Sequence, residues 1–178
     1  MDIKEAVQRV EKELKNFSCD EYEIFIDYTK GTDVEVVEGR VDTFQKNESI
    51  GMALRVIKDG VIGFSYTTDF RDLKLKDVIM KAISSLEVVS GDVHNSFPSG
   101  TDEELPHLTI FDEALLSVND SERIEQAILL EQVAYACDTR IKRTRKAEYG
   151  DCLYEIHLKN SLGVDYSYKG TAVSCALM

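Results

Sequence analysis

The spacing of apolar residues predicts two amphipathic helices on either side of a run of short strands. One set of residues at helical spacing begins the chain, and a second set follows residue 70. The first set is Ile3, Ala6, Val7, Val10 and Leu14, and the second is Leu75, Val78, Ile79, Ala82 and Leu86. Between them, segments rich in β-branched and aromatic residues predict five strands, at residues 22–28, 34–37, 41–46, 50–57 and 61–66.

Two glycine-containing turns connect these strands, at Glu38-Gly39-Arg40 and at Asp59-Gly60. An Asp-Gly pair between two strand-like segments is a strong hairpin signal, because the primed turn needs positive φ at both central residues. Strands joined by such short connections pair as antiparallel neighbours. We therefore predict an antiparallel β-meander, with both helices covering one face of it.

The second half of the chain predicts a different arrangement. Residues 90–118 contain both prolines and predict an exposed crossover. Asn119, with Glu122 three positions later, predicts the start of a long helix. The apolar residues of this helix cover more than one narrow stripe of its surface, so we expect the helix to be buried over much of its circumference. A strand at residues 148–159 and a last strand ending on apolar residues 172–178 complete the chain.

The predicted fold class is α+β: an antiparallel β-meander covered by helices on one face, followed by a long helix and a C-terminal β-hairpin. Along the sequence we distinguish three parts. Residues 1–89 form a helix–five-strand meander–helix half, residues 90–118 a crossover loop, and residues 119–178 a half made of a helix and a β-hairpin. Together they constitute one domain.

Composition narrows the class of function. The 178 residues carry a formal net charge of −12, which repels phosphate backbones and argues against direct nucleic-acid binding. No apolar run approaches the roughly 18 residues of a spanning helix, so we expect no membrane partner.

The four cysteines form no C-x-x-C pair and the charged start is unlike a signal peptide, which predicts a cytoplasmic protein with reduced thiols. We expect Cys137, Cys152 and Cys175 to be small core residues.

Five cations lie within seven residues: Arg140, Lys142, Arg143, Arg145 and Lys146. They fit a helix C-terminus followed by a solvated strand edge, where cations suit the helix dipole and discourage edge pairing. They also fit a docking patch for an acidic partner. The sequence favours the first interpretation and leaves the second open.

The residues alone assign no catalytic, cofactor-binding or metal-binding role. His94, His107 and His157 each lack a second His or Cys at metal-ligand spacing. His157 alternates with the apolar residues of its strand, so we expect it to be solvated. Arg55 lies between two apolar strand residues, and we favour a partly buried ion pair over full solvation.

Several motifs follow one another in a set order. They are VEVVEGRV at residues 34–41, GMALRVIKDG at 51–60, GFSYTTD at 63–69, SERIE at 121–125 with EQVA at 131–134, DTRI at 138–141 and NSLGV at 160–164. This ordered set resembles the amino-terminal half of the TldD/PmbA family, closer to the PmbA branch, and it covers nearly the whole chain.

The resemblance implies a relationship to zinc metallopeptidases that work as dimers, cut peptides within an enclosed cavity and were also labelled modulators of DNA gyrase. The catalytic motif of the family, H-E-x-x-x-H, belongs to the TldD-type subunit and lies in its carboxy-terminal half. Its two histidines would hold zinc and its Glu would activate the bound water. This sequence contains no H-E-x-x-x-H, so no catalytic or zinc-binding residue is carried over to it.

The resemblance therefore implies a truncated, non-catalytic N-terminal domain of a PmbA-like protein, inactive alone, which shapes the peptide cavity and the dimer contacts. Its expected partners are the missing C-terminal domain, a TldD-like or identical subunit, and a peptide substrate. An alternative is a stand-alone protein- or peptide-binding module that uses the terminal strand at residues 173–178. A third hypothesis is a self-sufficient hydrolase.

Overall fold

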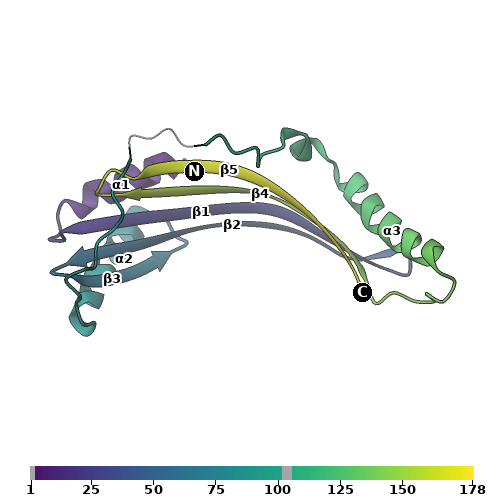
Figure 1. Ribbon diagram of the computed structural model, residues 1–178, viewed down its shortest axis with the longest axis horizontal. Helices are drawn as coiled ribbons and strands as arrows, with labels where there is room; N and C mark the ends of the chain where they lie inside the picture. Colours follow the sequence, from purple (N-terminus) through teal and green to yellow (C-terminus); the bar gives the residue numbers. More distant parts are fainter. Residues whose placement is uncertain (1–2, 102–105) are drawn as a thin grey trace. The chain divides into compact units, whose positions relative to one another are not determined.

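The computed structural model describes residues 3–101 and 106–178, which form an α+β fold with a five-stranded sheet (Figure 1). The elements are α1 (Ile3–Leu14), β1 (Glu21–Val37), β2 (Arg40–Lys58), β3 (Val61–Thr67), α2 (Asp72–Ser85), the 3₁₀ helices η1 (Leu86–Val88) and η2 (Glu113–Ser117), α3 (Asp120–Cys137), β4 (Ala147–Asn160) and β5 (Asp165–Leu177). The strands lie in the order β3-β2-β1-β4-β5. This architecture confirms the predicted fold class.

The meander consists of three strands, and the prediction of five is wrong. Each of the long strands β1 and β2 joins two of the predicted strands. Gly31 marks a close approach between strands instead of a strand end, because a Cβ there would lie 2.7 Å from the carbonyl oxygen of Asp151 on β4. The polar residues 46–49 stay extended because backbone hydrogen bonds, and not side-chain polarity, hold a strand in its sheet.

The two tight turns lie where the sequence predicts them. Glu38 and Gly39 join β1 to β2 with φ values of 52° and 72°, and Asp59 and Gly60 join β2 to β3 with values of 50° and 74°. Positive φ at both central residues matches the twist of the flanking strands. The second turn sets the register of the β2–β3 pair, which runs without interruption from its closing residues to the end of β3.

The chain divides into two compact units. The first unit takes the described parts of Met1–Tyr28, Ser49–Pro106 and Glu155–Tyr168, and the second takes those of Thr29–Glu48, His107–Tyr154 and Lys169–Met178. Four of the strands, β1, β2, β4 and β5, contribute residues to both units. The spatial division therefore interleaves segments that are far apart in the sequence.

The first unit has the larger apolar core. The helices α1 and α2 pack together and cover one face of the meander, as the sequence predicts. Alternate residues of β1 and β2 meet the apolar stripes of both helices. The most deeply buried side chains of this core include Val10, Ile24, Leu54, Val56 and Ile79. Burial of each such side chain contributes roughly 1.5–3 kcal/mol, which explains why these residues determine the fold of this unit.

In the second unit, α3 packs through a narrow stripe, and the prediction of burial over much of its circumference is wrong. Ala127, Glu131 and Ala134 are buried, whereas Leu129 and Val133 are half exposed. Only the stripe that faces the apolar residues of the sheet is covered. Those residues are Val34, Val36, Ala147 and Tyr149.

The beginning of α3 follows the sequence. The Asn119 side chain accepts a hydrogen bond from the Glu122 amide at 3.0 Å, and the Glu122 carboxylate accepts one from the Asn119 amide at 3.0 Å. This reciprocal capping box satisfies two amide groups that the helix itself leaves unpaired. Among the helices of the described residues, none combines the length and the hydrophobicity that crossing a membrane requires.

Candidate functional site

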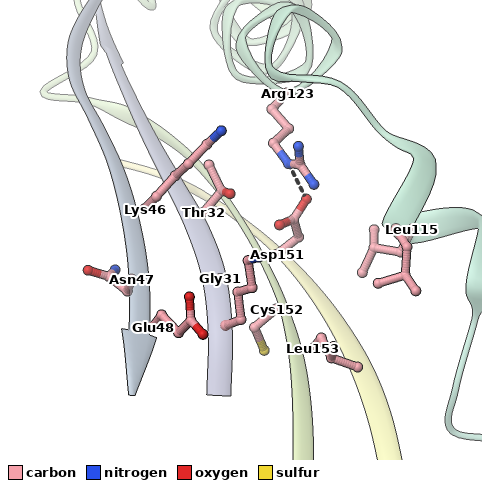
Figure 2. Close-up of a pocket in the computed structure, with 12 residues that line it drawn as sticks. Gly31, Thr32, Lys46, Asn47, Glu48, Leu115, Arg123, Asp151, Cys152 and Leu153 are labelled. Carbon is pink, nitrogen blue, oxygen red and sulfur yellow. Dashed lines mark hydrogen bonds and ion pairs between the residues drawn. The ribbon is translucent and has the colours of Figure 1, made fainter. Parts of the chain in front are cut away.

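The second unit contains a hollow of about 620 Å³, bordered by three strands, η2 and the first turns of α3 (Figure 2). This volume lies within the usual range of small-molecule sites. Its lining combines three cations, two acids, an amide, small residues and three leucines. The lining residues are Lys30, Gly31, Thr32, Lys46, Asn47, Glu48, Leu115, Leu116, Arg123, Asp151, Cys152 and Leu153.

A buried ion pair between α3 and β4 forms part of the wall. The Arg123 Nε donates to Asp151 Oδ2 at 2.6 Å, and the two side chains are 12% and 5% exposed. The Tyr149 hydroxyl donates to the same oxygen at 3.1 Å, and Arg123 Nη1 donates to the Val118 carbonyl at 2.7 Å. Burial, together with the hydrogen bond to Asp151, raises the pKa of Tyr149 to about 12. These contacts fix the guanidinium and the carboxylate in one orientation.

The two lysines of the hollow differ in their partners. Lys46 Nζ lies 2.8 Å from Asp120 Oδ2, and about half of each side chain is exposed. The hydrogen bond from Lys46 lowers the pKa of Asp120 below its usual value. Lys30 is exposed, and its side chain forms neither a hydrogen bond nor an ion pair with any residue that the structure describes. Its ammonium group is therefore available to a ligand.

A second polar cluster in this unit surrounds the buried carboxylate of Glu131. It accepts the backbone N–H groups of Glu38 at 3.0 Å and Gly39 at 2.6 Å, and the hydroxyl groups of Thr144 and Tyr135. Burial raises the pKa of Glu131, but the four hydrogen bonds together outweigh it and leave the pKa below its ordinary value. This carboxylate is buried and accepts four hydrogen bonds from its own unit, so its role is to join α3 to the β1–β2 turn.

His157 is buried, so the prediction that it is solvated is wrong. Only 5% of the residue is exposed, and its Nε2 lies 3.4 Å from Asp165 Oδ1 without a hydrogen bond in the described part of the chain. The start of β5 and the helix α1 cover it, which strand alternation alone did not indicate. His94 and His107 are exposed.

The described residues do not fit a zinc site. Within residues 3–101 and 106–178, no three or more His, Cys, Asp and Glu side chains come together in a group that could hold a metal ion. We therefore derive no step through a metal on this chain.

Arg55 forms the ion pair that the sequence favours. Its guanidinium contacts the carboxylate of Glu23, which is buried, while about half of the Arg55 side chain remains exposed. The guanidinium carbon also lies 5.1 Å from the centre of the Phe97 ring, within cation–π range. This confirms a structural role in the first unit.

The basic run lies in the loop between α3 and β4. Because α3 ends at Cys137, the run is not part of the last turn of the helix, as one interpretation assumed. Three of its five cations pair with acids of the same unit. The pairs are Arg140 with Asp138, Arg143 with Glu38, and Lys146 with Glu35 and Glu148. These pairs favour a solvated surface over a docking patch.

The cysteines differ from the prediction. Cys137 and Cys175 are exposed, and Cys152, which is partly buried, lines the hollow. None of the four forms a disulfide. Exposure of Cys137 follows from the narrow contact stripe of α3.

Sequence reasoning missed the residues that build the hollow and the Glu131 cluster. Arg123 and Asp151 are 28 positions apart, and no local pattern connects them. Glu131 did carry a signal, because an acid in the same helical stripe as Ala127 and Ala134 must find partners inside the protein.

Two family models match consecutive parts of the chain. The model of the PmbA/TldA metallopeptidase domain 1 matches residues 22–87, and that of the PmbA/TldA metallopeptidase central domain matches residues 113–178. An uncharacterized protein of Methanocaldococcus jannaschii is 26% identical over 182 residues. That alignment covers 99% of this chain and 39% of the relative.

Solved structures share the fold. A candidate modulator of DNA gyrase from Bacteroides thetaiotaomicron aligns with a TM-score of 0.86 and 21% identity, and one from Thermotoga maritima with 0.82 and 19%. TldE from Thermococcus kodakarensis aligns with 0.79 and 22%. Each alignment covers 97–98% of this chain and 38–39% of the other. The chain thus spans about two fifths of the length of the proteins that it matches.

Proposed function

This chain belongs to the PmbA/TldD metallopeptidase family, and we propose that it is the non-catalytic N-terminal part of a longer PmbA-like subunit. In this role it forms part of the wall of a cavity in which peptides are cut, and it supplies contacts to a second, TldD-like or identical, subunit. Hydrolysis itself takes place on another part of the assembly.

The observation that carries this proposal is the pair of consecutive domain matches. They correspond to the first and central domains of the family, and the chain spans only about 39% of its relative from Methanocaldococcus jannaschii. The sequence contains no H-E-x-x-x-H motif, and its described residues offer no donor set for zinc. The proposal therefore assigns zinc chemistry to residues outside this sequence.

Two further features support the proposed setting. The net charge of −12 favours an action on peptides over direct contact with DNA. The four free thiols fit the reducing cytoplasm, where we propose that the protein acts.

The test begins with the gene beyond codon 178. We expect a continuation that encodes a family-like C-terminal domain, and we expect the longer protein to cleave unfolded peptides only together with a TldD-like subunit and zinc. The 178-residue chain alone should cleave none. A stop codon directly after position 178 would contradict the proposal, and zinc-dependent cleavage by the chain alone would establish the self-sufficient hydrolase instead.

A second candidate function, a stand-alone protein- or peptide-binding module, is favoured by the position of β5 at the edge of the sheet. The Thr171 amide donates to Ile110, away from β4, whereas the Met178 amide donates to Lys146 at the start of β4. Backbone amides alternate between the two sides of a strand. Odd-numbered amides of β5 therefore point away from β4.

Three such amides follow Thr171, at Val173, Cys175 and Leu177, and the side chains of Val173 and Leu177 are about half exposed. An extended segment of a partner could add to this edge as a further strand. The Val173→Lys and Leu177→Lys variants should weaken such binding, because charges discourage edge pairing. A monodisperse monomer that retains no extended peptide in fluorescence polarisation would contradict this second function.

A further inference from the structure

We infer that the hollow between α3, η2 and the strands β1, β2 and β4 is a binding site for a carboxylate that carries an apolar group. The inference is independent of the proposed function, because it rests only on charges, contacts and volume within the second unit. It names a ligand class, an amphipathic organic anion, for residues without an assigned role.

After the internal Arg123–Asp151 pair is accounted for, the lining of the hollow retains two lysines, Lys30 and Lys46, and one acid, Glu48. Arg123 and Asp151 neutralise each other at 2.6 Å, and Tyr149 occupies the same carboxylate oxygen. Lys46 contacts Asp120 at the surface, where solvent competes and such pairs contribute little. Lys30 pairs with no described residue. An anion that displaces solvent beside Lys30 and Lys46 therefore gains attraction without breaking a buried contact.

Lys30 differs from several cations of the same unit in having no acidic partner among the described residues. The sequence has 33 acidic residues against 21 lysines and arginines, so a lysine has a surplus of possible partners. Elsewhere in the same unit, Arg140, Arg143 and Lys146 are all paired with carboxylates. Lys30 remains unpaired in the described structure although it lines a hollow of ligand size.

Three leucines supply the apolar part of the site. Leu115 and Leu116 come from η2, and Leu153 from β4. In Figure 2 Lys46 and Leu115 lie on opposite sides of the hollow. A ligand that spans both parts needs a charged end and an apolar end. Burial of its apolar end against the leucines adds a hydrophobic contribution to binding.

Glu48 in the lining distinguishes a carboxylate from a phosphate. Its repulsion of a bound anion grows with the charge of the ligand. A monoanionic carboxylate is therefore repelled less strongly than a phosphate dianion. Two sources supply this chemistry: the C-terminal carboxylate of a short peptide, and a small fatty or N-acylated acid.

The wall that faces such a ligand is held rigidly. Arg123 is fixed by the carboxylate of Asp151 and by the carbonyl group of Val118, at 2.6 and 2.7 Å. A side chain whose hydrogen bonds are already satisfied does not need to reorganise when a ligand enters. Binding then costs mainly the ordering of the two lysines.

The test measures binding to the 178-residue chain by calorimetry with four probes: N-acetyl-leucyl-leucine, its C-terminal amide, octanoate and inorganic phosphate. We expect at least one of the two acids to bind saturably and at least about tenfold more tightly than both the amide and phosphate. The tighter of the two acids identifies the source. If neither acid binds, or if the amide or phosphate binds equally well, the inference is overturned.

Variants locate the site. Lys30→Gln and Lys46→Gln should each weaken acid binding about three- to fivefold, and added salt should weaken it further. Lys142→Gln is the matched control, because Lys142 is an exposed lysine of the same unit outside the hollow, and it should leave affinity unchanged. Leu116→Gln should weaken the binding of octanoate, because it removes part of the apolar lining. Equal affinities for the Lys30, Lys46 and Lys142 variants, with unchanged thermal stability, would overturn the assignment.

Discussion

The carboxylate of Glu131 on α3 accepts a hydrogen bond from the backbone N–H of Gly39 at 2.6 Å, although the two residues are 92 positions apart. Gly39 lies in the β1–β2 turn, and the amide of Glu38 donates to the same carboxylate. The turn and the helix thus satisfy each other's polar groups in a buried setting, where an unpaired group is costly. This contact holds α3 at the end of the hairpin.

Removal of the Glu131 charge should destabilise the second unit. In Glu131→Gln the new amide group offers N–H donors where backbone N–H donors already point, so at least one hydrogen bond is lost. We expect a loss of about 2 kcal/mol in the free energy of unfolding, measured by urea denaturation. Glu125→Gln changes the same residue type on an exposed position of α3 and should have little effect. Equal stability of the two variants would contradict the role of this carboxylate.

A fall in pH should reduce the stabilisation that the Glu131 carboxylate provides. The pKa of Glu131 lies below its ordinary value of 4.5, so ionisation of Glu131 stabilises the folded protein at pH values above 4.5. This stabilisation should decrease as the pH falls from 4.5 through the lower pKa of the folded state. The stability difference between the wild type and Glu131→Gln should therefore shrink on acidification from pH 6 to pH 3. A constant difference over this range would disagree with the linkage.

The Arg123–Asp151 pair should be sensitive to the loss of either partner. Asp151→Asn leaves a guanidinium with 12% exposure without its counter-charge, and we expect a loss of about 3 kcal/mol in the free energy of unfolding. Asp120→Asn removes an exposed partner of the same arginine and should cause a much smaller change. Thermal or urea unfolding of both variants provides the comparison, and equal losses would show that burial does not control this pair.

The two turn glycines should respond differently to alanine. Both have positive φ, but a Cβ at Gly39 meets nothing within 4 Å, whereas one at Gly60 would lie 2.5 Å from the carbonyl oxygen of Asp92. Gly39→Ala should therefore cost about 1 kcal/mol, the conformational penalty alone. Gly60→Ala adds a clash with backbone and should cost at least about 1 kcal/mol more. Urea denaturation curves of both variants test this order, and equal shifts would contradict it.

Features with short-range causes were predictable from the sequence. The turns at Glu38-Gly39 and Asp59-Gly60 depend on local backbone preferences, and the capping box at Asn119 depends on two residues three positions apart. The apolar stripes of α1 and α2 likewise predicted which residues form the core of the first unit. The α+β class follows from these local elements and their order.

Predictions from local sequence patterns were wrong where the structure depends on contacts with distant segments. The sequence predicted a break between strands at residues 22–28 and 34–37, but the missing side chain of Gly31 in this interval accommodates β4, which is more than a hundred residues away in sequence. The apolar residues Val133 and Cys137 of α3 contributed to the prediction of a widely buried helix, but both are exposed to solvent. His157 had the alternation of a solvated residue, yet packing against α1 and β5 buries it.

The element types, the positions of the turns, the fold class and the family resemblance could all be predicted from the sequence, because these depend on neighbours along the chain. Tertiary structure alone decided the hollow and the Glu131 cluster. Lys30, Lys46, Arg123 and Asp151 come from four different elements. The pairing of β2, β1 and β4 in the sheet and the packing of α3 against it bring them together. Charge pairing inside a protein depends on distance in space, and a linear pattern does not encode that distance.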